Sequence, residues 1–235
     1  MNTDIILRAH NVSLTYRRRE GFLKTFSHTA LKDISFELKR GETIGILGKN
    51  GCGKSSLLRI LAGVIDPTGG KVECPPGTTR ALLTLGLGFQ PGLSGRENAL
   101  YSAMLQGTPK KRAKELIPAI RDFAELGEFF DQPVETYSSG MRARLGFATA
   151  LMTEVDILLI DEVLSVGDSH FRLKAEAAML DKIGSDQTVV FVSHNSDQVN
   201  KICDSAIWIE GGAICASGHT PTVAHQYNLF MKSLE

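Results

Sequence analysis

The stretch GILGKNGCGKSS, Gly45 to Ser56, decides the fold of this chain. Its segment Gly48–Ser55 matches the pattern G-x-x-x-x-G-K-[ST] and follows an apolar run at Glu42–Leu47. Glycines let backbone N–H groups point inward around an anion, and a helix that begins near Gly53 directs the positive end of its dipole at the same place. The stretch therefore predicts a strand, a phosphate-binding loop and a helix, with a nucleoside triphosphate as ligand. The alternative, a glycine-rich turn that matches by chance, is disfavoured by this placement.

Residues of the loop receive separate expected roles. Lys54 should reach the β- and γ-phosphates as a catalytic cation, and the hydroxyl of Ser55 should bind Mg²⁺. We expect the remaining residues of the stretch to contact the nucleotide as well: Gly48, Lys49, Asn50, Gly51, Cys52, Gly53 and Ser56. We interpret Cys52 as a tolerated small residue rather than a redox site.

Two carboxylates follow another apolar run downstream, in the segment DILLIDE. An acid at the end of a strand commonly accompanies a phosphate-binding loop, so we expect Asp161 to hold Mg²⁺ directly or through water. A carboxylate beside the metal can polarise the water that attacks the γ-phosphate, which is the role expected for Glu162. In the alternative interpretation, the pair only opens a polar loop after a buried strand.

A histidine follows the apolar run of TVVFVSHN. A lone histidine is more often structural than catalytic. His194, however, comes directly after the strand, and open α/β sheets bind their ligands beyond the carboxyl ends of their strands. We therefore include His194 among the candidate catalytic residues.

The pattern around these motifs predicts a largely parallel α/β sheet, because apolar strand-like runs alternate with helical sequence. The expected strands are Ile5–Tyr16, Ile34–Leu38, Glu42–Leu47, Lys71–Glu73, Arg80–Leu85, Ile157–Ile160, Thr188–Val192 and Ala206–Glu210. Helices are expected over Gly53–Ala62, within Arg96–Phe130, and over Gly140–Met152 and Pro221–Lys232. We expect a core from residues 1–85 and 154–235, with an inserted helical subdomain over residues 86–153.

The composition and charge of the chain exclude several classes of function. The chain has 235 residues, 43% of them hydrophobic, and a formal net charge of zero, so no global charge favours a nucleic-acid partner. Its four cysteines show no metal-binding spacing and are typical of a reduced cytosolic protein. The N-terminus has no signal-peptide pattern, and no apolar run approaches the ~20 residues of a spanning helix. If the protein serves a membrane process, another chain should do the spanning.

The segment YSSGMRARLGFATAL, Tyr137 to Leu151, completes a set of motifs in a fixed order. With Ser138–Met141 at the position of the family's signature, the whole chain resembles the ATP-binding-cassette ATPases. The resemblance implies a P-loop nucleotide-binding domain with a RecA-like core, an antiparallel β subdomain and an inserted helical subdomain that carries the signature. It also implies ATP and Mg²⁺ as cofactors.

The particular forms that these motifs take in this sequence resemble the ATPase subunits of bacterial polysaccharide exporters. These variants are YSSGM, DEVLSVGDSHFRLK, FVSHN and GFQPGLSGREN. The resemblance implies ATP hydrolysis that drives export of a lipid-linked polysaccharide of O-antigen type across the inner membrane. The chain ends at Glu235, so we expect no C-terminal carbohydrate-binding domain. Alternatives are a lipid or drug as cargo, a non-transport regulatory ATPase, and a nucleotide-binding scaffold without turnover.

The resemblance further implies a dimer of two copies that sandwich two ATP molecules head to tail. Ser139 and the backbone of Gly140 would contact a γ-phosphate across the dimer, where the helix N-terminus forms a second anion site. Asp168 would lie at the dimer seam, Tyr16 would stack on adenine, and Gln90 would touch Mg²⁺. The expected partners are a second copy, a separate membrane permease and the lipid-linked substrate, at the cytoplasmic face of the membrane.

The stretch RRREGFLKTF, Arg17 to Phe26, lies between two predicted strands. A tight hairpin needs only about two to five loop residues, so we expect a long connection here. In one interpretation its apolar residues, Phe22, Leu23 and Phe26, pack on the protein's own surface. In the other, Arg17–Arg19 bind the pyrophosphate of the lipid-linked substrate or anionic lipid, because arginine binds phosphate in bidentate fashion.

Overall fold

The chain divides into two compact units in the computed structural model, which describes residues 4–20, 24–83, 86–161 and 168–234. Unit 1 takes its described residues from Met1–Thr78, Ile157–Glu162 and Ile183–Glu235. Unit 2 takes its described residues from Thr79–Asp156 and Val163–Lys182. The chain leaves unit 1 and returns to it twice, so each unit is built from segments that are far apart in the sequence.

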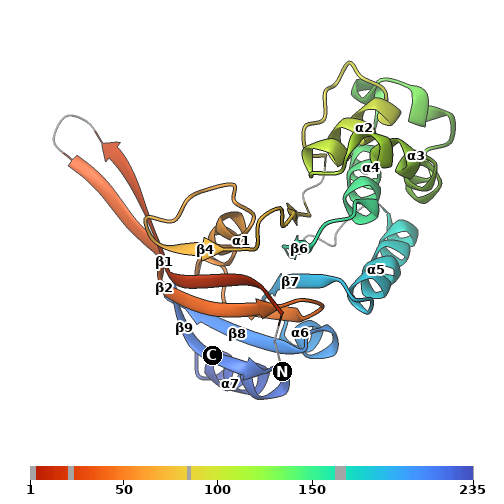
Figure 1. The fold of residues 1–235 in the computed structure, drawn as a ribbon. Helices are drawn as coiled ribbons and strands as arrows, with labels where there is room; N and C mark the ends of the chain where they lie inside the picture. The colour runs from red at the N-terminus through yellow and green to blue at the C-terminus, as the bar shows by residue number, and fades with distance from the viewer. Residues whose placement is uncertain (1–3, 21–23, 84–85, 162–167, 235) are drawn as a thin grey trace. The chain divides into compact units, whose positions relative to one another are not determined.

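Buried parallel strands form the centre of unit 1 (Figure 1). They lie in the order β6 (Ile157–Ile160), β7 (Thr188–Ser193), β3 (Thr43–Leu47) and β8 (Ser205–Glu210), each parallel to the next. Every residue of β3, β6 and β7 is buried, which is typical of parallel strands in α/β proteins. The α/β fold class predicted from the alternation of apolar and helical segments is confirmed.

A further strand, β9 (Ala213–His219), pairs with β8 in the antiparallel direction and was not predicted. Its sequence, AICASGH, is mostly small or polar, and none of its residues is fully buried. Neither the alternation nor the apolar run that identifies a strand in the sequence is present here.

Helices pack closely on the parallel strands of unit 1. α1 (Lys54–Leu61) follows β3, α6 (Ser196–Ile202) packs on β3 and β7, and α7 (Thr220–Lys232) packs on β8 and β9. Gly45 permits the approach of α6, because a Cβ atom there would lie 2.4 Å from Cγ1 of Val199. The predicted helix after the phosphate-binding loop and the predicted C-terminal helix are both present.

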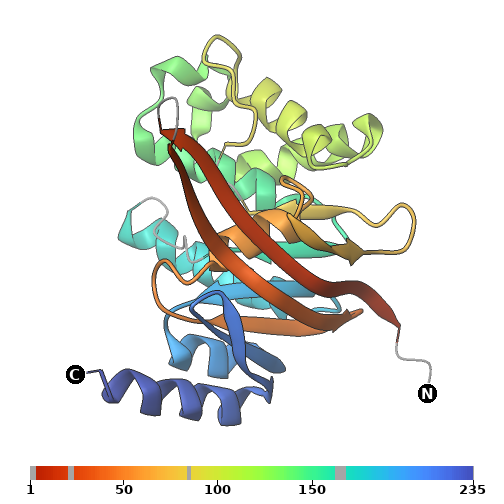
Figure 2. The same cartoon turned by 90° about the vertical axis from the view of Figure 1, so that its left-hand side faces the viewer.

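A long antiparallel hairpin corrects the expectation for the Arg17–Phe26 stretch (Figures 1 and 2). β1 (Ile5–Glu20) and β2 (Lys24–Lys39) pair along their length, with β4 (Gly69–Glu73) on the other side of β1. The long connection expected between two shorter strands is therefore wrong. Exposed polar residues in this part of the hairpin give no apolar alternation, yet the backbone ladder continues from a buried base.

Tyr16, Arg18 and their cross-strand partners project from one face of the outer hairpin. Tyr16 pairs with His28 and Arg18 with Phe26, without a register shift beyond Thr15. Phe26 is 55% exposed, so the described part of the stretch does not support packing on the protein's own surface for this residue. Phe22 and Leu23 lie outside the described residues.

Unit 2 is mainly helical and has its own core. Its elements are β5 (Arg80–Leu82), α2 (Gly95–Leu105), α3 (Lys110–Ala124), α4 (Ser139–Met152), α5 (Ser169–Ile183) and the 3-10 turns η1 (Gly127–Asp131) and η2 (Val134–Thr136). The rings of Phe123, Phe147 and Phe171 lie 5.7–6.2 Å apart, centroid to centroid. Phe130 is completely buried in a neighbouring cluster with residues of α3 and α4.

The length and polarity of the helices decide whether any of them could span a membrane. Within the part of the chain that the structure describes, no helix is both long and apolar enough to cross a bilayer.

Phe129 and Phe130, which are adjacent in the sequence, allow a test of the packing in the core of unit 2. Phe130→Ala should lower the free energy of unfolding by about 3–5 kcal/mol, because the side chain is completely buried in the core of unit 2. Phe129→Ala should change it by less than about 0.5 kcal/mol, because that side chain is 51% exposed. Urea denaturation of both variants is the measurement, and equal losses would contradict the described core.

Candidate functional site

The phosphate-binding loop is clamped between two other parts of unit 1. Gly53 precedes α1 with φ of 109°, and a Cβ atom there would lie 2.4 Å from the carbonyl oxygen of Ala30. A Cβ atom at Gly48 would lie 2.4 Å from the carbonyl oxygen of Ile209. Because any side chain at these positions would clash with backbone, glycine is required for the loop to take this path.

Lys54 lies inside the loop. Its Nζ donates hydrogen bonds to the carbonyl oxygens of Gly48 at 2.6 Å and Lys49 at 2.8 Å. The residue is only 7% exposed, so a buried ammonium group is satisfied by the loop that surrounds it. A cation is therefore fixed at the place where the motif requires one for phosphate.

Ser55 and Asp161 meet although they are far apart in the sequence. The hydroxyl of Ser55, in the first turn of α1, donates to Oδ2 of Asp161 at 2.8 Å. A hydroxyl and a carboxylate are hard oxygen ligands, and Mg²⁺ is usually held by one or two protein groups together with phosphate oxygens and water. The donor set of this pair therefore fits the Mg²⁺ that the sequence predicted.

Strand ends bring the predicted groups to one edge of the parallel sheet. In the register of the sheet, Leu47 pairs with Ser193 and Ile160 pairs with Phe191. The phosphate-binding loop, Asp161 and His194 directly follow the carboxyl ends of β3, β6 and β7. His194 is exposed there. Glu162, the expected catalytic carboxylate, lies outside the described residues.

A cavity of about 220 Å³ joins the loop to the hairpin. Tyr16 lines it, is 42% exposed, and its hydroxyl lies 3.1 Å from Oγ of Ser56. The full lining is Tyr16, His28, Ala30, Asn50, Gly51, Gly53, Lys54, Ser55, Ser56 and Asp161. His28 and Ala30 were not predicted, because only the pairing of β1 with β2 brings them beside Tyr16.

Two further side chains of the loop, those of Cys52 and Lys49, are held by their packing in the protein. Cys52 is buried, and this burial raises the pKa of its thiol, so the group stays protonated and unreactive at neutral pH. Nζ of Lys49 lies 5.2 Å from the ring centroid of Phe230 in α7, which is cation–π geometry. The loop therefore also contacts the C-terminal helix.

The signature segment lies in unit 2, at the start of α4. Ser138 caps this helix, because its side chain accepts a hydrogen bond from the backbone N–H of Met141 at 3.1 Å. Ser139 and Gly140 occupy the first turn, and no side chain projects from Gly140 over the helix end. This is the geometry of a helix N-terminus open to an anion.

Asp168 is held at the start of α5, also in unit 2. Its Oδ1 accepts a hydrogen bond from the Phe171 N–H at 2.9 Å, and Arg144 forms an ion pair with its other oxygen. The hydrogen bond from Phe171, together with the charge of Arg144, lowers the pKa of this carboxyl group. Asp168 is thus an ionised and fixed residue.

Gln90, the candidate metal ligand, is exposed in a loop of unit 2. Its backbone is fixed from both sides by the buried side chain of Asn98, which accepts from the Gln90 N–H at 2.7 Å and donates to its carbonyl at 3.0 Å. The structure therefore groups Gln90 with Ser139, Gly140 and Asp168 in unit 2, whereas the phosphate-binding residues belong to unit 1.

The loop after Gln90 is hydrogen-bonded to the residues before the signature. Backbone hydrogen bonds run from Val134 to Leu93 and from Glu135 to Pro91, each 2.9 Å long. The hydroxyl of Tyr137 donates to the carbonyl of Phe129 at 2.6 Å. Segments 91–95 and 132–137 thus form one connected piece.

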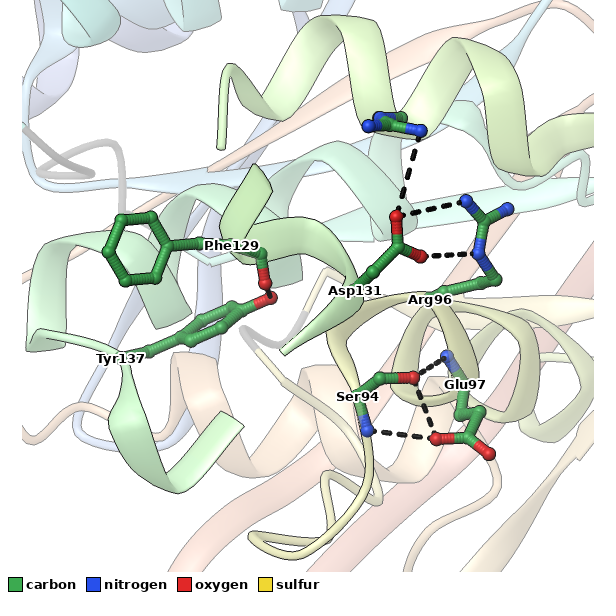
Figure 3. Close-up of polar contacts among 7 residues, drawn as sticks. Ser94, Arg96, Glu97, Phe129, Asp131 and Tyr137 are labelled. Atoms are coloured by element: carbon green, nitrogen blue, oxygen red, sulfur yellow. Dashed lines mark hydrogen bonds and ion pairs between the residues drawn. The ribbon is translucent and has the colours of Figure 1, made fainter. Parts of the chain in front are cut away.

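Ion pairs and a capping box hold the same region together (Figure 3). The Ser94 side chain and the Glu97 carboxylate cap the start of α2 reciprocally. Arg96 donates to Asp131 at 2.6 Å, which lowers the pKa of that carboxyl group. These contacts anchor α2 to η1.

The fold and the loop define a P-loop protein that binds a nucleoside triphosphate. Residues 31–165 match the family description "ABC transporter", and this chain belongs to that family. The predicted membership among the ATP-binding-cassette ATPases is confirmed.

Relatives point to export systems. The chain is 42% identical to an O-antigen export system ATP-binding protein of Klebsiella pneumoniae, over 92% of this chain and 87% of that protein. It is 44% identical to a protein of the same description from Myxococcus xanthus, over 85% of this chain, but spans only 45% of that protein's length. A teichoic acids export ATP-binding protein of Listeria innocua is 42% identical over 89% of this chain and 62% of that protein.

Solved structures share the fold. An ATP-binding subunit of an ABC transporter superposes with a TM-score of 0.75 at 20% identity, over 95% of this chain and 94% of that chain. A dimeric ATP-binding cassette in a post-hydrolysis state, bound to ADP and Pi, gives a TM-score of 0.73 at 22% identity, over 92% of this chain and 99% of that chain.

Tyr137 gives a pH-dependent test of the connected piece before the signature. Burial raises the pKa of this phenol to about 12, whereas an unfolded tyrosine ionises near pH 10. The protonated form is favoured in the folded state, so this contribution is complete below pH 10 and is lost as the pH rises toward 12. Between pH 9.5 and 11.5 the wild-type chain should lose roughly 1–2 kcal/mol more stability than Tyr137→Phe. Identical pH dependence in urea denaturation would contradict a buried phenol.

Proposed function

We propose that this chain is the ATPase subunit of a transporter that exports a lipid-linked polysaccharide. The observation that carries the proposal is the contact of Ser55 with Asp161 beside the buried Lys54, because these groups would suit a metal–triphosphate complex. Relatives more than 40% identical, named for O-antigen and teichoic acid export, support the cargo class. The cargo that we propose is accordingly a polysaccharide carried on a lipid.

Residues of unit 1 would bind and hydrolyse ATP. Lys54 and the loop N–H groups would hold the phosphates, and Tyr16 would contact adenine. Ser55 and Asp161 would hold Mg²⁺, which when bound supplies charge that stabilises the phosphoryl group during transfer. Glu162 would orient and polarise the attacking water, and His194 would approach the γ-phosphate from the end of β7.

Residues of unit 2 would complete the site of a second copy. Ser139 and Gly140 offer the N-terminus of α4 to a γ-phosphate, which supports a head-to-tail homodimer with ATP between the copies. Asp168 would lie at the dimer seam, and Gln90 would contact Mg²⁺. Hydrolysis would remove the shared anion and release the dimer, which makes the γ-phosphate a switch.

A separate membrane permease is the proposed partner, at the cytoplasmic face of the cell membrane. Large apolar side chains are exposed in unit 2 near the Gln90 loop and on α2, including Leu87 at 40%, Tyr101 at 47% and Leu105 at 63% exposure. Exposed apolar groups that gather in one region commonly mark protein interfaces. This region of unit 2 is therefore the proposed permease contact.

Deletion of the gene tests the cargo and the activity together. We expect loss of surface polysaccharide with accumulation of its lipid-linked form inside the cell, measured by extraction and immunoblotting. The wild-type gene should restore export, whereas Glu162→Gln should not, because hydrolysis would stop at the ATP-bound dimer. Glu176→Gln, the same change at an exposed position of α5, is the control and should restore export. Unchanged surface glycan after deletion would refute this cargo.

The basic hairpin gives a second test. Arg17–Arg19 are exposed on β1, and we propose that they contact the phosphate-bearing substrate or anionic lipid. Replacing all three with Gln should leave ATP hydrolysis by the purified chain within about twofold of wild type and reduce export in cells at least tenfold. Replacing Lys110, Lys111 and Lys114, three exposed cations of α3, is the charge-matched control. Normal export by the arginine variant would show that the hairpin charges have no such role.

A further inference from the structure

The side of the cavity that the β1–β2 hairpin forms carries a second ring beside Tyr16, the imidazole of His28. His28 is the direct cross-strand partner of Tyr16, and both line the same cavity of about 220 Å³ as the phosphate-binding loop. Directly opposite residues of an antiparallel pair project from the same face, with Cβ atoms about 4.5–5.5 Å apart. The phenol and the imidazole therefore form one continuous wall.

The position of this wall relative to the loop decides which part of a ligand it meets. The carbonyl of Ala30 touches the loop, since a Cβ atom at Gly53 would lie 2.4 Å from it. His28 lies two residues farther along β2, about 6–7 Å away on the same face. It therefore stands beside the loop and not within it, too far to replace the N–H groups that hold the phosphates. The cavity that the loop lines continues to this wall, so the rest of a nucleotide held by the loop has space on this side.

The chemistry of the imidazole suits that part of the ligand. His28 is exposed, and a neutral imidazole offers one hydrogen-bond donor and one acceptor. Ribose hydroxyls and the edges of a base donate and accept in the same way, whereas a triphosphate tail only accepts. We propose that His28 is a nucleoside-binding residue that contacts the ribose–base half of the nucleotide whose phosphates the loop holds. The inference rests on the nucleotide binding of the proposed function and adds a residue to it.

The opposite face of the hairpin supplies a matched control. Thr15 and Thr29 point away from the cavity lining and contact each other, with their hydroxyl oxygens 3.1 Å apart. Ser27 lies next to His28, projects to that same opposite face, pairs with Arg17 and is exposed. Ser27→Ala therefore changes the hairpin one residue from His28 without changing the cavity.

Titration of the full chain with two ligands separates the nucleoside from the phosphates. Calorimetry would measure the Kd of Mg²⁺–ATP and of inorganic tripolyphosphate with Mg²⁺, which has no nucleoside. His28→Ala should raise the Kd for ATP about three- to tenfold, the effect of one hydrogen bond, and leave the Kd for tripolyphosphate within about twofold of wild type. Ser27→Ala should bind both ligands like wild type.

Each negative result of these titrations would contradict a different claim. An unchanged Kd for ATP in His28→Ala would overturn the inference while leaving nucleotide binding intact. Equal weakening of ATP and tripolyphosphate would also overturn it, because the substitution would then act on the loop. If the wild-type chain bound neither ligand, the proposed function itself would fail, and this inference with it.

Discussion

The register of β7 against its two neighbours is the constraint on which the site in unit 1 depends. Pairing of Leu47 with Ser193, and of Ile160 with Phe191, makes three strands end at one edge. The loop, Asp161 and His194 are simply the next residues along the chain. A slip of one residue would move a strand end by about 3.3 Å and turn its side chains to the opposite face. The contact between Ser55 and Asp161 could not survive such a slip.

The loop keeps its shape through contacts within the protein. Backbone carbonyls of Ala30 and Ile209 approach it so closely that a Cβ atom at Gly53 or Gly48 would not fit. Lys54 contributes from inside, because its ammonium group binds two loop carbonyls. An unpaired buried ammonium would be costly, so these bonds both satisfy the cation and draw the loop around it. Donors that are already in place lose little freedom when an anion binds.

Local patterns and long-range pairing differ in how far they could be predicted from the sequence. The phosphate-binding loop, β6 and α4 were predictable because each is encoded by a short stretch with a distinct pattern. The length of the hairpin was not, since Arg17–Arg19 and their partners have no apolar alternation. His28 was missed for a related reason: only the register of β1 with β2 places it opposite Tyr16. A residue whose role depends on which strands pair has no distinctive pattern in the sequence around it.

The residues that lead into the signature helix of unit 2 are hydrogen-bonded to the loop that follows Gln90. Hydrogen bonds join residues 91–95 to residues 132–137, and the ring of Tyr137 fills the space beside Gly95, where a Cβ atom would lie 2.2 Å from its hydroxyl oxygen. In the proposed transporter the Gln90 loop would face the permease, while Ser139 and Gly140 would face ATP. A rigid piece that touches both ligands transmits a displacement at either end to the other. Because such coupling is reciprocal, a permease that favours one position of this piece must also change the affinity of the dimer for ATP.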